Sequence, residues 1–321
     1  GISDWQDEAL LGIGGGKDSI VAGELLKEID VKPTGFVLAT GEILGQTQAV
    51  ADVMEIDLLP IKRRLDQKIL EINKLDGAYN GHIPISLIFG LVGAVLAVAR
   101  GSKYVVVANE ASSSIPQAAW GGEKVNHQWS KSIEFERLFQ DYLHAYVSEE
   151  LHYFSAIRPL TSVAIAKVFA QYPQYFETFT SDNSLFKIKQ GERDHPRWSS
   201  DSSKSLSSYI LMAPWFSSED LDRTFGRNFL EKSDLQVTFE AMLGKDGQSV
   251  LDCVGTPEEL RISLGLLKEQ NRMMEASLMQ AAIQQDLIGD PSWLNSLLAF
   301  DEHALPPELL ERLLEKMKGR L

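Results

Sequence analysis

A short glycine-rich stretch near the start of the chain most restricts what the chain can fold into. An apolar run over residues 9–13 is followed by three glycines and then by Lys17-Asp18-Ser19, after which apolar residues recur at helical spacing. This pattern predicts a strand, a tight turn and the start of a helix. Glycine permits positive φ, so several N–H groups can point at one anion, and a helix N-terminus adds more of them. Lys17 can add a positive charge and Ser19 a hydroxyl.

The spacing of this motif distinguishes between two kinds of phosphate loop. The Walker loop needs Gly-x-x-x-x-Gly-Lys-Ser/Thr, which this stretch lacks. Gly-Gly-Gly-Lys-Asp-Ser instead resembles Ser-Gly-Gly-x-Asp-Ser, the pyrophosphate loop (PP-loop) of the N-type ATP pyrophosphatases, which split ATP between its α and β phosphates. The alternative is a glycine-rich turn without a ligand. The resemblance implies that ATP is bound by Gly14, Gly15, Gly16, Lys17, Asp18 and Ser19.

Strands and helices alternate along the first half of the chain. We expect strands over residues 35–40, 58–61 and 103–108, and helices over residues 46–56, 66–75 and 84–99. This order predicts an α/β fold with a doubly wound, mostly parallel sheet over residues 1–175, followed by a mainly helical region over residues 176–321. The glycine-rich loop and Asn109-Glu110 then share one sheet edge, so both are candidates for binding the nucleotide.

Composition restricts the partners of the chain. Its 321 residues are 44% hydrophobic, enough for a large core, and its net charge of −14 disfavours nucleic acid. The apolar stretch 83–99 is short for a membrane span and contains Pro84, Gly90 and Gly93, so it predicts a buried helix and no membrane partner. A single cysteine, Cys253, and a first strand with no signal peptide ahead of it predict a cytoplasmic location.

A second polar segment, over residues 121–136, lies between two glycines and an amphipathic helix. Asn126 and His127 could orient a substrate or exchange protons, Lys131 could meet an anion, and Glu134 could hold Mg²⁺. The alternative is a polar helix start capped by a serine.

Three further side chains are isolated candidates, each with an ordinary structural alternative. His82 precedes a helix start, where it could face a ligand or cap the helix. Arg158 could contact an anion or lie on the surface. Cys253 could be an acid–base thiol or a small buried residue.

The second half of the chain contains fewer chemical signals. Ser199, Ser202 and Ser205 have the Cys-x-x-Cys-x-x-Cys interval, but hydroxyls do not hold zinc as thiolates do, so we expect no zinc. Residues 252–259 predict a loop that enters a helix capped by Thr256. An apolar stripe near the end predicts a docking face and consists of Leu309, Leu310, Leu313, Leu314 and Met317.

Taken together, the loop 14–19, Asn109-Glu110, and residues 125–132, 158–160 and 252–256 resemble the MurL family. Its members are UDP-N-acetylmuramoyl-L-alanyl-L-glutamate epimerases of bacterial peptidoglycan synthesis. The resemblance implies that UDP-MurNAc-L-Ala-L-Glu is the substrate, that its terminal L-Glu becomes D-Glu, and that ATP is consumed with Mg²⁺ to give AMP and pyrophosphate. The family also has a domain ahead of the loop, for which this sequence shows no counterpart.

This resemblance assigns roles to the candidates. We expect proton transfer by His127, with Cys253 and Lys131 as further catalytic candidates, and Mg²⁺ at Asp18 and Glu134. Substrate contacts are expected from His82, Asn126, Ser130 and Arg158. Two other functions remain open: a PP-loop ligase or amidotransferase that adenylates another carboxylate or amide, and a non-catalytic nucleotide-binding protein.

Overall fold

The computed structural model describes residues 4–40, 45–78, 83–182, 197–247, 250, 252 and 254–321. His82 and Cys253 lie outside the described residues, so their proposed roles stay predictions.

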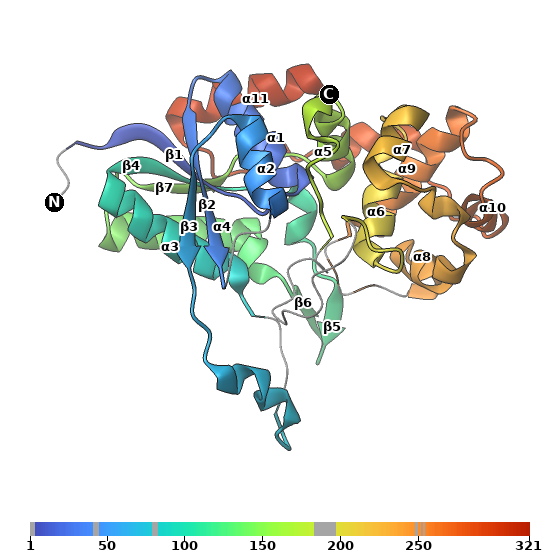
Figure 1. The fold of residues 1–321 in the computed structure, drawn as a ribbon, viewed down its shortest axis with the longest axis horizontal. Helices are drawn as coiled ribbons and strands as arrows, with labels where there is room; N and C mark the ends of the chain where they lie inside the picture. Colours follow the sequence, from blue (N-terminus) through green and yellow to red (C-terminus); the bar gives the residue numbers. More distant parts are fainter. Residues whose placement is uncertain are drawn as a thin grey trace.

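Five parallel strands form the central sheet, in the order β3–β2–β1–β4–β7 (Figure 1). The neighbouring strands β1 and β4 each begin with polar residues and continue as an apolar run, in which Leu10, Leu11, Val105 and Val106 are fully buried, as expected for strands covered on both faces. The predicted doubly wound parallel sheet is therefore confirmed. The strands are β1 (Gln6–Gly12), β2 (Lys32–Ala39), β3 (Leu58–Lys62), β4 (Ser102–Val107) and β7 (His152–Ser155).

Helices cover both faces of the sheet. Two separate apolar clusters form, one containing residues of α1 (Lys17–Glu28), α2 (Gly45–Met54) and α5 (Ser162–Phe169), the other residues of α3 (Ile85–Arg100) and α4 (Ile133–Tyr146). The predicted burial of the apolar stretch holds for only one face of α3, since Val95 is 70% exposed. In the described part of the chain, no helix has the length and apolar character needed to cross a membrane.

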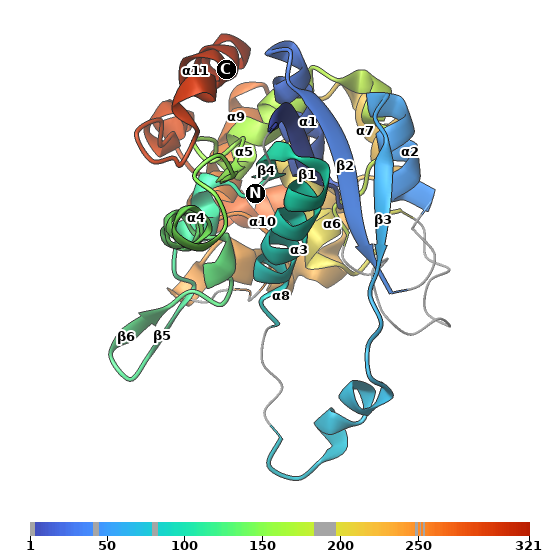
Figure 2. The same ribbon diagram turned by 90° about the vertical axis from the view of Figure 1, so that its left-hand side faces the viewer.

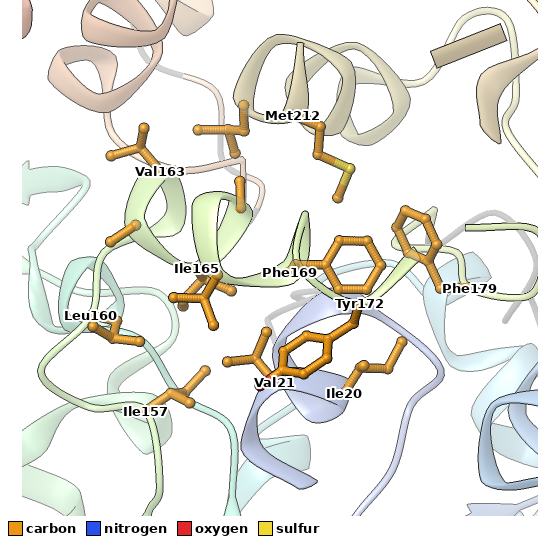
Figure 3. Packing of buried hydrophobic residues seen from close by; sticks show 14 of the residues in the cluster. Ile20, Val21, Ile157, Leu160, Val163, Ile165, Phe169, Tyr172, Phe179 and Met212 are labelled. Carbon is orange, nitrogen blue, oxygen red and sulfur yellow. The ribbon is translucent and has the colours of Figure 1, made fainter. Parts of the chain in front are cut away.

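The second half of the chain is mainly helical, as predicted, and its helices gather at one end of the sheet (Figure 1). Figure 3 shows α5 packed against Ile20 and Val21 of α1 and against Met212 of α6, so sheet and helical region share one apolar core. The division at residue 175 stays a prediction. The helices are α6 (Ser203–Met212), α7 (Ser218–Phe225), α8 (Gln236–Met242), α9 (Pro257–Glu269) and α10 (Ser277–Gln284).

The last helix, α11 (Pro307–Arg320), returns to the sheet and docks beside α1 (Figure 1). Leu309, Leu313 and Met317 are at most 2% exposed, which confirms the predicted docking stripe. The predicted start of α9 is also confirmed: Thr256 and Glu259 form a reciprocal capping box, with Pro257 at the first helical position.

Two segments differ from the sequence prediction. Residues 66–75 form two 3-10 helices, Gln67–Leu70 and Ile72–Lys74, on an arm that projects from the end of β3 (Figures 1 and 2). Leu75 is 63% exposed, and a short helix with little to pack against is marginal in water.

Residues 118–125 form the second difference, an exposed hairpin of β5 (Ala118–Trp120) and β6 (Glu123–Val125). Gly121 and Gly122 have φ of +58° and +87°, which is typical of a tight two-residue hairpin turn. The two glycines therefore turn a hairpin and do not open the polar segment that follows.

Candidate functional site

A polar pocket lies between the carboxyl ends of β1 and β4, at the point where the order of the strands along the chain reverses. Ligands of open α/β sheets bind at this switch point. This first pocket has a volume of about 80 Å³, and both predicted loops contribute to it. Its lining includes Lys17, Asp18, Asn109, Glu110, Lys131, Ser162, Ser181 and Lys204.

The glycine-rich loop has the backbone that its sequence predicts. Gly15 has φ of +86°, a left-handed conformation that side chains disfavour, and its carbonyl accepts a hydrogen bond of 3.0 Å from the Thr180 N–H. Gly16 is the N-cap of α1 and supplies no side-chain cap for the first turn. A Cβ on Gly16 would lie 3.2 Å from Ser181 Oγ, whereas one on Gly14 would meet nothing within 4 Å. Glycine is therefore favoured at Gly15 by its backbone conformation, while a side chain at Gly16 would crowd Ser181.

Lys17 places a buried positive charge at the base of this loop. The residue is 5% exposed, and its Nζ lies 2.5 Å from Asp18 Oδ1. Burial lowers the pKa of Lys17, but the carboxylates of Asp18, Glu110 and Glu259 outweigh it, so the pKa is raised and the ammonium persists. Ser181 Oγ is buried at the same pocket with no hydrogen-bond partner among the described residues. The donors available here suit an anion such as phosphate.

Arg158 lies beneath the pocket and not in its lining. It is 1% exposed, and its Nη2 donates to Glu136 Oε2 at 2.6 Å and to the Lys131 carbonyl at 2.8 Å. Nη1 donates to the Glu110 carbonyl at 2.8 Å and to Ser113 Oγ at 3.0 Å. Arg158 therefore ties the loop after β4 to the turn before α4. This burial favours a structural role over the substrate contact expected from the sequence.

Some residues of the polar string 125–132 make structural hydrogen bonds, and others line the first pocket. Asn126 Nδ2 donates to the Ser113 carbonyl at 2.9 Å, and its Oδ1 accepts from the Gln128 N–H at 2.9 Å. Ser132 caps α4 by accepting from the Phe135 N–H at 3.2 Å. The capped helix start considered as an alternative is thus present, while Lys131 and Gln128 still line the first pocket.

Three further candidates, His127, Ser130 and Glu134, are not part of the lining of the first pocket. His127 Nδ1 is 2.9 Å from Gln117 Oε1, and Ser130 is 6% exposed. Glu134 is exposed and accepts from Trp129 Nε1 at 2.8 Å, apart from the carboxylate of Asp18 with which it was expected to share Mg²⁺. The described part of the chain contains no group of three or more His, Cys, Asp or Glu that could hold a metal ion. Asp18 is the predicted metal ligand that lines the pocket.

A second pocket of about 270 Å³ adjoins the first. Its walls are partly apolar, with Ile115, Pro116 and Met242, and partly polar, with Gln117 and Thr256. The residues that line both pockets are Glu110, Gln128, Val254 and Gly255.

Glu259, at the start of α9, is a buried carboxylate that the sequence analysis treated only as part of a cap. It is 1% exposed, and burial together with the negative charge of Glu110 raises its pKa to about 7. Its hydrogen bond within the cap follows from the Thr256-x-x-Glu259 spacing, but nothing local indicated that the carboxylate lies near Glu110, 149 positions earlier in the chain.

The three serines with zinc-ligand spacing gather at the start of α6. Asp182, 1% exposed, accepts at Oδ2 from the Ser199 N–H at 2.9 Å and from Ser205 Oγ at 2.7 Å. Ser202 caps α6. These serines fix the N-terminal end of the helix that brings Lys204 to the first pocket.

The fold and this pocket define an open parallel α/β protein with a glycine-rich loop and a buried lysine at its switch point. Residues 2–156 match the model of the MurL N-terminal domain, and residues 178–291 match that of the MurL C-terminal domain. The chain belongs to the MurL family.

Relatives named UDP-N-acetyl-alpha-D-muramoyl-L-alanyl-L-glutamate epimerase align over most of this chain. The protein from Micromonospora sp. is 34% identical over 88% of this chain and 62% of its own length, and that from Salinispora tropica is 34% identical over 88% and 60%. The protein from Xanthomonas oryzae pv. oryzae is 33% identical over 95% of this chain and 67% of its own length. This chain thus spans about three fifths to two thirds of the length of these relatives.

Proposed function

We propose that this chain performs the epimerisation for which its relatives are named, inverting the terminal glutamate of UDP-MurNAc-L-Ala-L-Glu in the cytoplasm. The observation that carries the proposal is the MurL match along both halves of the chain, combined with the anion-suited loop at the switch point. ATP and Mg²⁺ complete the proposed reaction.

The chemistry explains why such an epimerisation consumes ATP. The α-hydrogen of glutamate is very weakly acidic, because its removal would add negative charge beside a carboxylate. Converting the α-carboxylate to an acyl adenylate removes that charge and lets an enolate delocalise the electron pair. Reprotonation on the opposite face inverts the centre, and water then releases AMP and the D-glutamyl product.

The first pocket supplies groups for the activating step. The N–H groups of Gly15 and Gly16 and the ammonium of Lys17 would bind the ATP phosphates. Asp18 lines the pocket, and Mg²⁺ is often held by one carboxylate together with substrate phosphates. When bound there, Mg²⁺ would neutralise charge on the phosphates. Asn109 lies beside the nucleotide in this proposal.

The second pocket supports binding of the peptide end of the substrate, because it adjoins the first and mixes apolar with polar walls. Lys131 lines the first pocket, and His127 bonds to Gln117 of the second, so both remain catalytic candidates, with Cys253. Asn126 and Ser130 would act by holding this wall in place. No role for nucleic acid enters this proposal.

Pyrophosphate release tests the proposal. The protein is incubated with ATP, Mg²⁺, ammonium as the amine donor and UDP-MurNAc-L-Ala-L-Glu in D₂O, and pyrophosphate, new amide and deuterium at the glutamyl Cα are measured. An epimerase gives both signals, whereas a ligase gives pyrophosphate and a new amide without deuterium. A non-catalytic nucleotide-binding protein gives neither. The variant Lys17→Ala should abolish pyrophosphate release, and retained release would contradict the loop assignment.

A further inference from the structure

Glu110 and Glu259 form a carboxylate pair bridged by one serine at the wall between the two pockets. Ser162 Oγ donates to Glu110 Oε2, while the Ser162 N–H donates to Glu259 Oε1 at 2.5 Å. Ser162 is 2% exposed and Glu259 is 1% exposed. The same residue thus holds both carboxylates, one through its side chain and the other through its backbone.

The Glu259 carboxylate accepts hydrogen bonds from three separate segments near the pockets. Its Oε1 also accepts from Ser112 Oγ at 3.2 Å, and its Oε2 accepts from the Thr256 N–H at 2.7 Å. These donors come from the loop after β4, from the start of α5 and from the loop before α9. A carboxylate that only caps a helix can stay exposed to water. Burying the Glu259 carboxylate beside the Glu110 carboxylate is costly, so capping alone does not account for this arrangement.

Glu110 lies where the reacting atoms of the proposed reaction would meet. It lines both pockets, so a substrate carboxyl entering from the second pocket and a phosphate held in the first would meet beside it. Its backbone is fixed, because the Glu110 carbonyl accepts from Arg158 Nη1 at 2.8 Å and from Ser113 Oγ at 2.6 Å. A proton acceptor needs this combination of position and fixed orientation.

Positive charges lie around the carboxylate pair at the first pocket. Lys17, on α1, attracts both Glu110 and Glu259, and Lys131 and Lys204 line the first pocket with Glu110. Glu259 is the more deeply buried of the two, and burial together with the charge of Glu110 raises its pKa. Glu259 therefore takes up a proton readily as the pH falls, and the hydroxyl of Ser162 continues to donate to Glu110.

We propose that Glu110 accepts the Cα proton of the adenylated glutamyl group, and that Glu259 is a positioning residue acting on Glu110 through Ser162. This inference rests on the proposed epimerase function and adds a proton-transfer residue to it. The Cα–H bond breaks, an O–H bond forms on Glu110, and the electron pair delocalises onto the acyl oxygen. A second acid then delivers a proton to the opposite face, the C–H bond reforms, and the acyl carbonyl is restored.

The test separates activation of the substrate from proton transfer. Pyrophosphate release reports the first step, and deuterium at the glutamyl Cα in D₂O reports the second. In Glu110→Gln, we expect the deuterium incorporated per pyrophosphate released to fall by about 100-fold or more, the usual contribution of a general base. Parallel loss of both signals would make Glu110 a nucleotide-binding residue, and retained deuterium incorporation would place the base elsewhere. Either result overturns the proposal.

Two further variants test the bridge, even where Glu110→Gln folds poorly. Ser162→Ala removes the hydroxyl but keeps the N–H that Glu259 accepts, so deuterium incorporation should fall about tenfold in kcat with KM unchanged, as expected when a catalytic group loses its orientation. Glu259→Gln should change the pH profile of deuterium incorporation while pyrophosphate release persists. A rise in KM alone in Ser162→Ala, or an unchanged pH profile in Glu259→Gln, contradicts the positioning role. If the unsubstituted protein releases no pyrophosphate with this substrate, the proposed function itself fails.

Discussion

Replacing Arg158 by methionine should markedly lower the melting temperature of the protein. The variant removes the cation that pairs with Glu136. The carboxylate left behind is fully buried, and among the described residues it still accepts a hydrogen bond of 3.0 Å from the Ser155 N–H. Breaking one side of a buried ion pair costs about 3–5 kcal/mol, because the other charge stays buried without compensation. In a protein of this size each kcal/mol lowers the melting temperature by roughly 2 °C, so we expect a fall of roughly 6–10 °C.

A thermodynamic cycle measured by denaturant unfolding checks the cause. Glu136→Gln leaves Arg158 uncompensated and should cost a similar amount, while the double variant should cost less than the sum of the two single variants. Arg137→Met, on the exposed side of α4, is the matched control and should change the free energy of unfolding by less than about 0.5 kcal/mol. An unchanged melting temperature for Arg158→Met, together with a raised KM, would refute this reasoning and restore a substrate contact.

Three other variants test the loop, the buried carboxylate and the last helix. Gly15→Ala should lower the free energy of unfolding by about 1–2 kcal/mol, because the φ of +86° at this position is unfavourable for alanine. Gly14→Ala is the control and should be tolerated, since a Cβ there meets nothing within 4 Å. Equal melting temperatures for the two variants would contradict this prediction. The pKa of Glu259 is raised to about 7 in the folded protein, so on raising the pH the unfolded chain loses this proton at a lower pH than the folded protein does. The free energy of unfolding should therefore fall by about 3 kcal/mol from pH 4.5 to 7, and Glu259→Gln should flatten that part of the pH–stability curve. Leu313→Ala on α11 should cost about 2–5 kcal/mol in denaturant unfolding, and the half-buried Leu314→Ala clearly less; similar costs would argue against the docked face.

The parts of the fold that follow from local rules could be predicted from the sequence. The apolar runs of the strands, the glycine-rich turn and the helix start at Thr256 each depend on residues a few positions apart, and the structure contains all three. The prediction of a helix over residues 66–75 was wrong, because the apolar side chains of this segment have little protein surface to pack against.

Roles that depend on distant partners could not be assigned in the same way. Arg158 looked like a free cation in the sequence, but its partner Glu136 is one of many acidic residues, and no local rule selects it. Asn126 and Glu259 have the same difficulty. Ser113 lies 13 residues before Asn126, on the other side of the β5–β6 hairpin, and Glu110 lies far from Glu259 in the chain, so no local spacing selects either partner. The loop of the candidate site was therefore predictable, while most of the wall opposite it was not.

The hydrogen bond between the Gly15 carbonyl and the Thr180 N–H links the glycine-rich loop to the segment that leads to α6. Two residues beyond Thr180, Asp182 holds Ser199 and Ser205 at the beginning of α6. A phosphate that displaced the glycine turn would therefore pull on α6 and move Lys204 relative to Lys17. If ATP binds as proposed, its binding would in this way act on the start of α6 as well as on the glycine-rich loop.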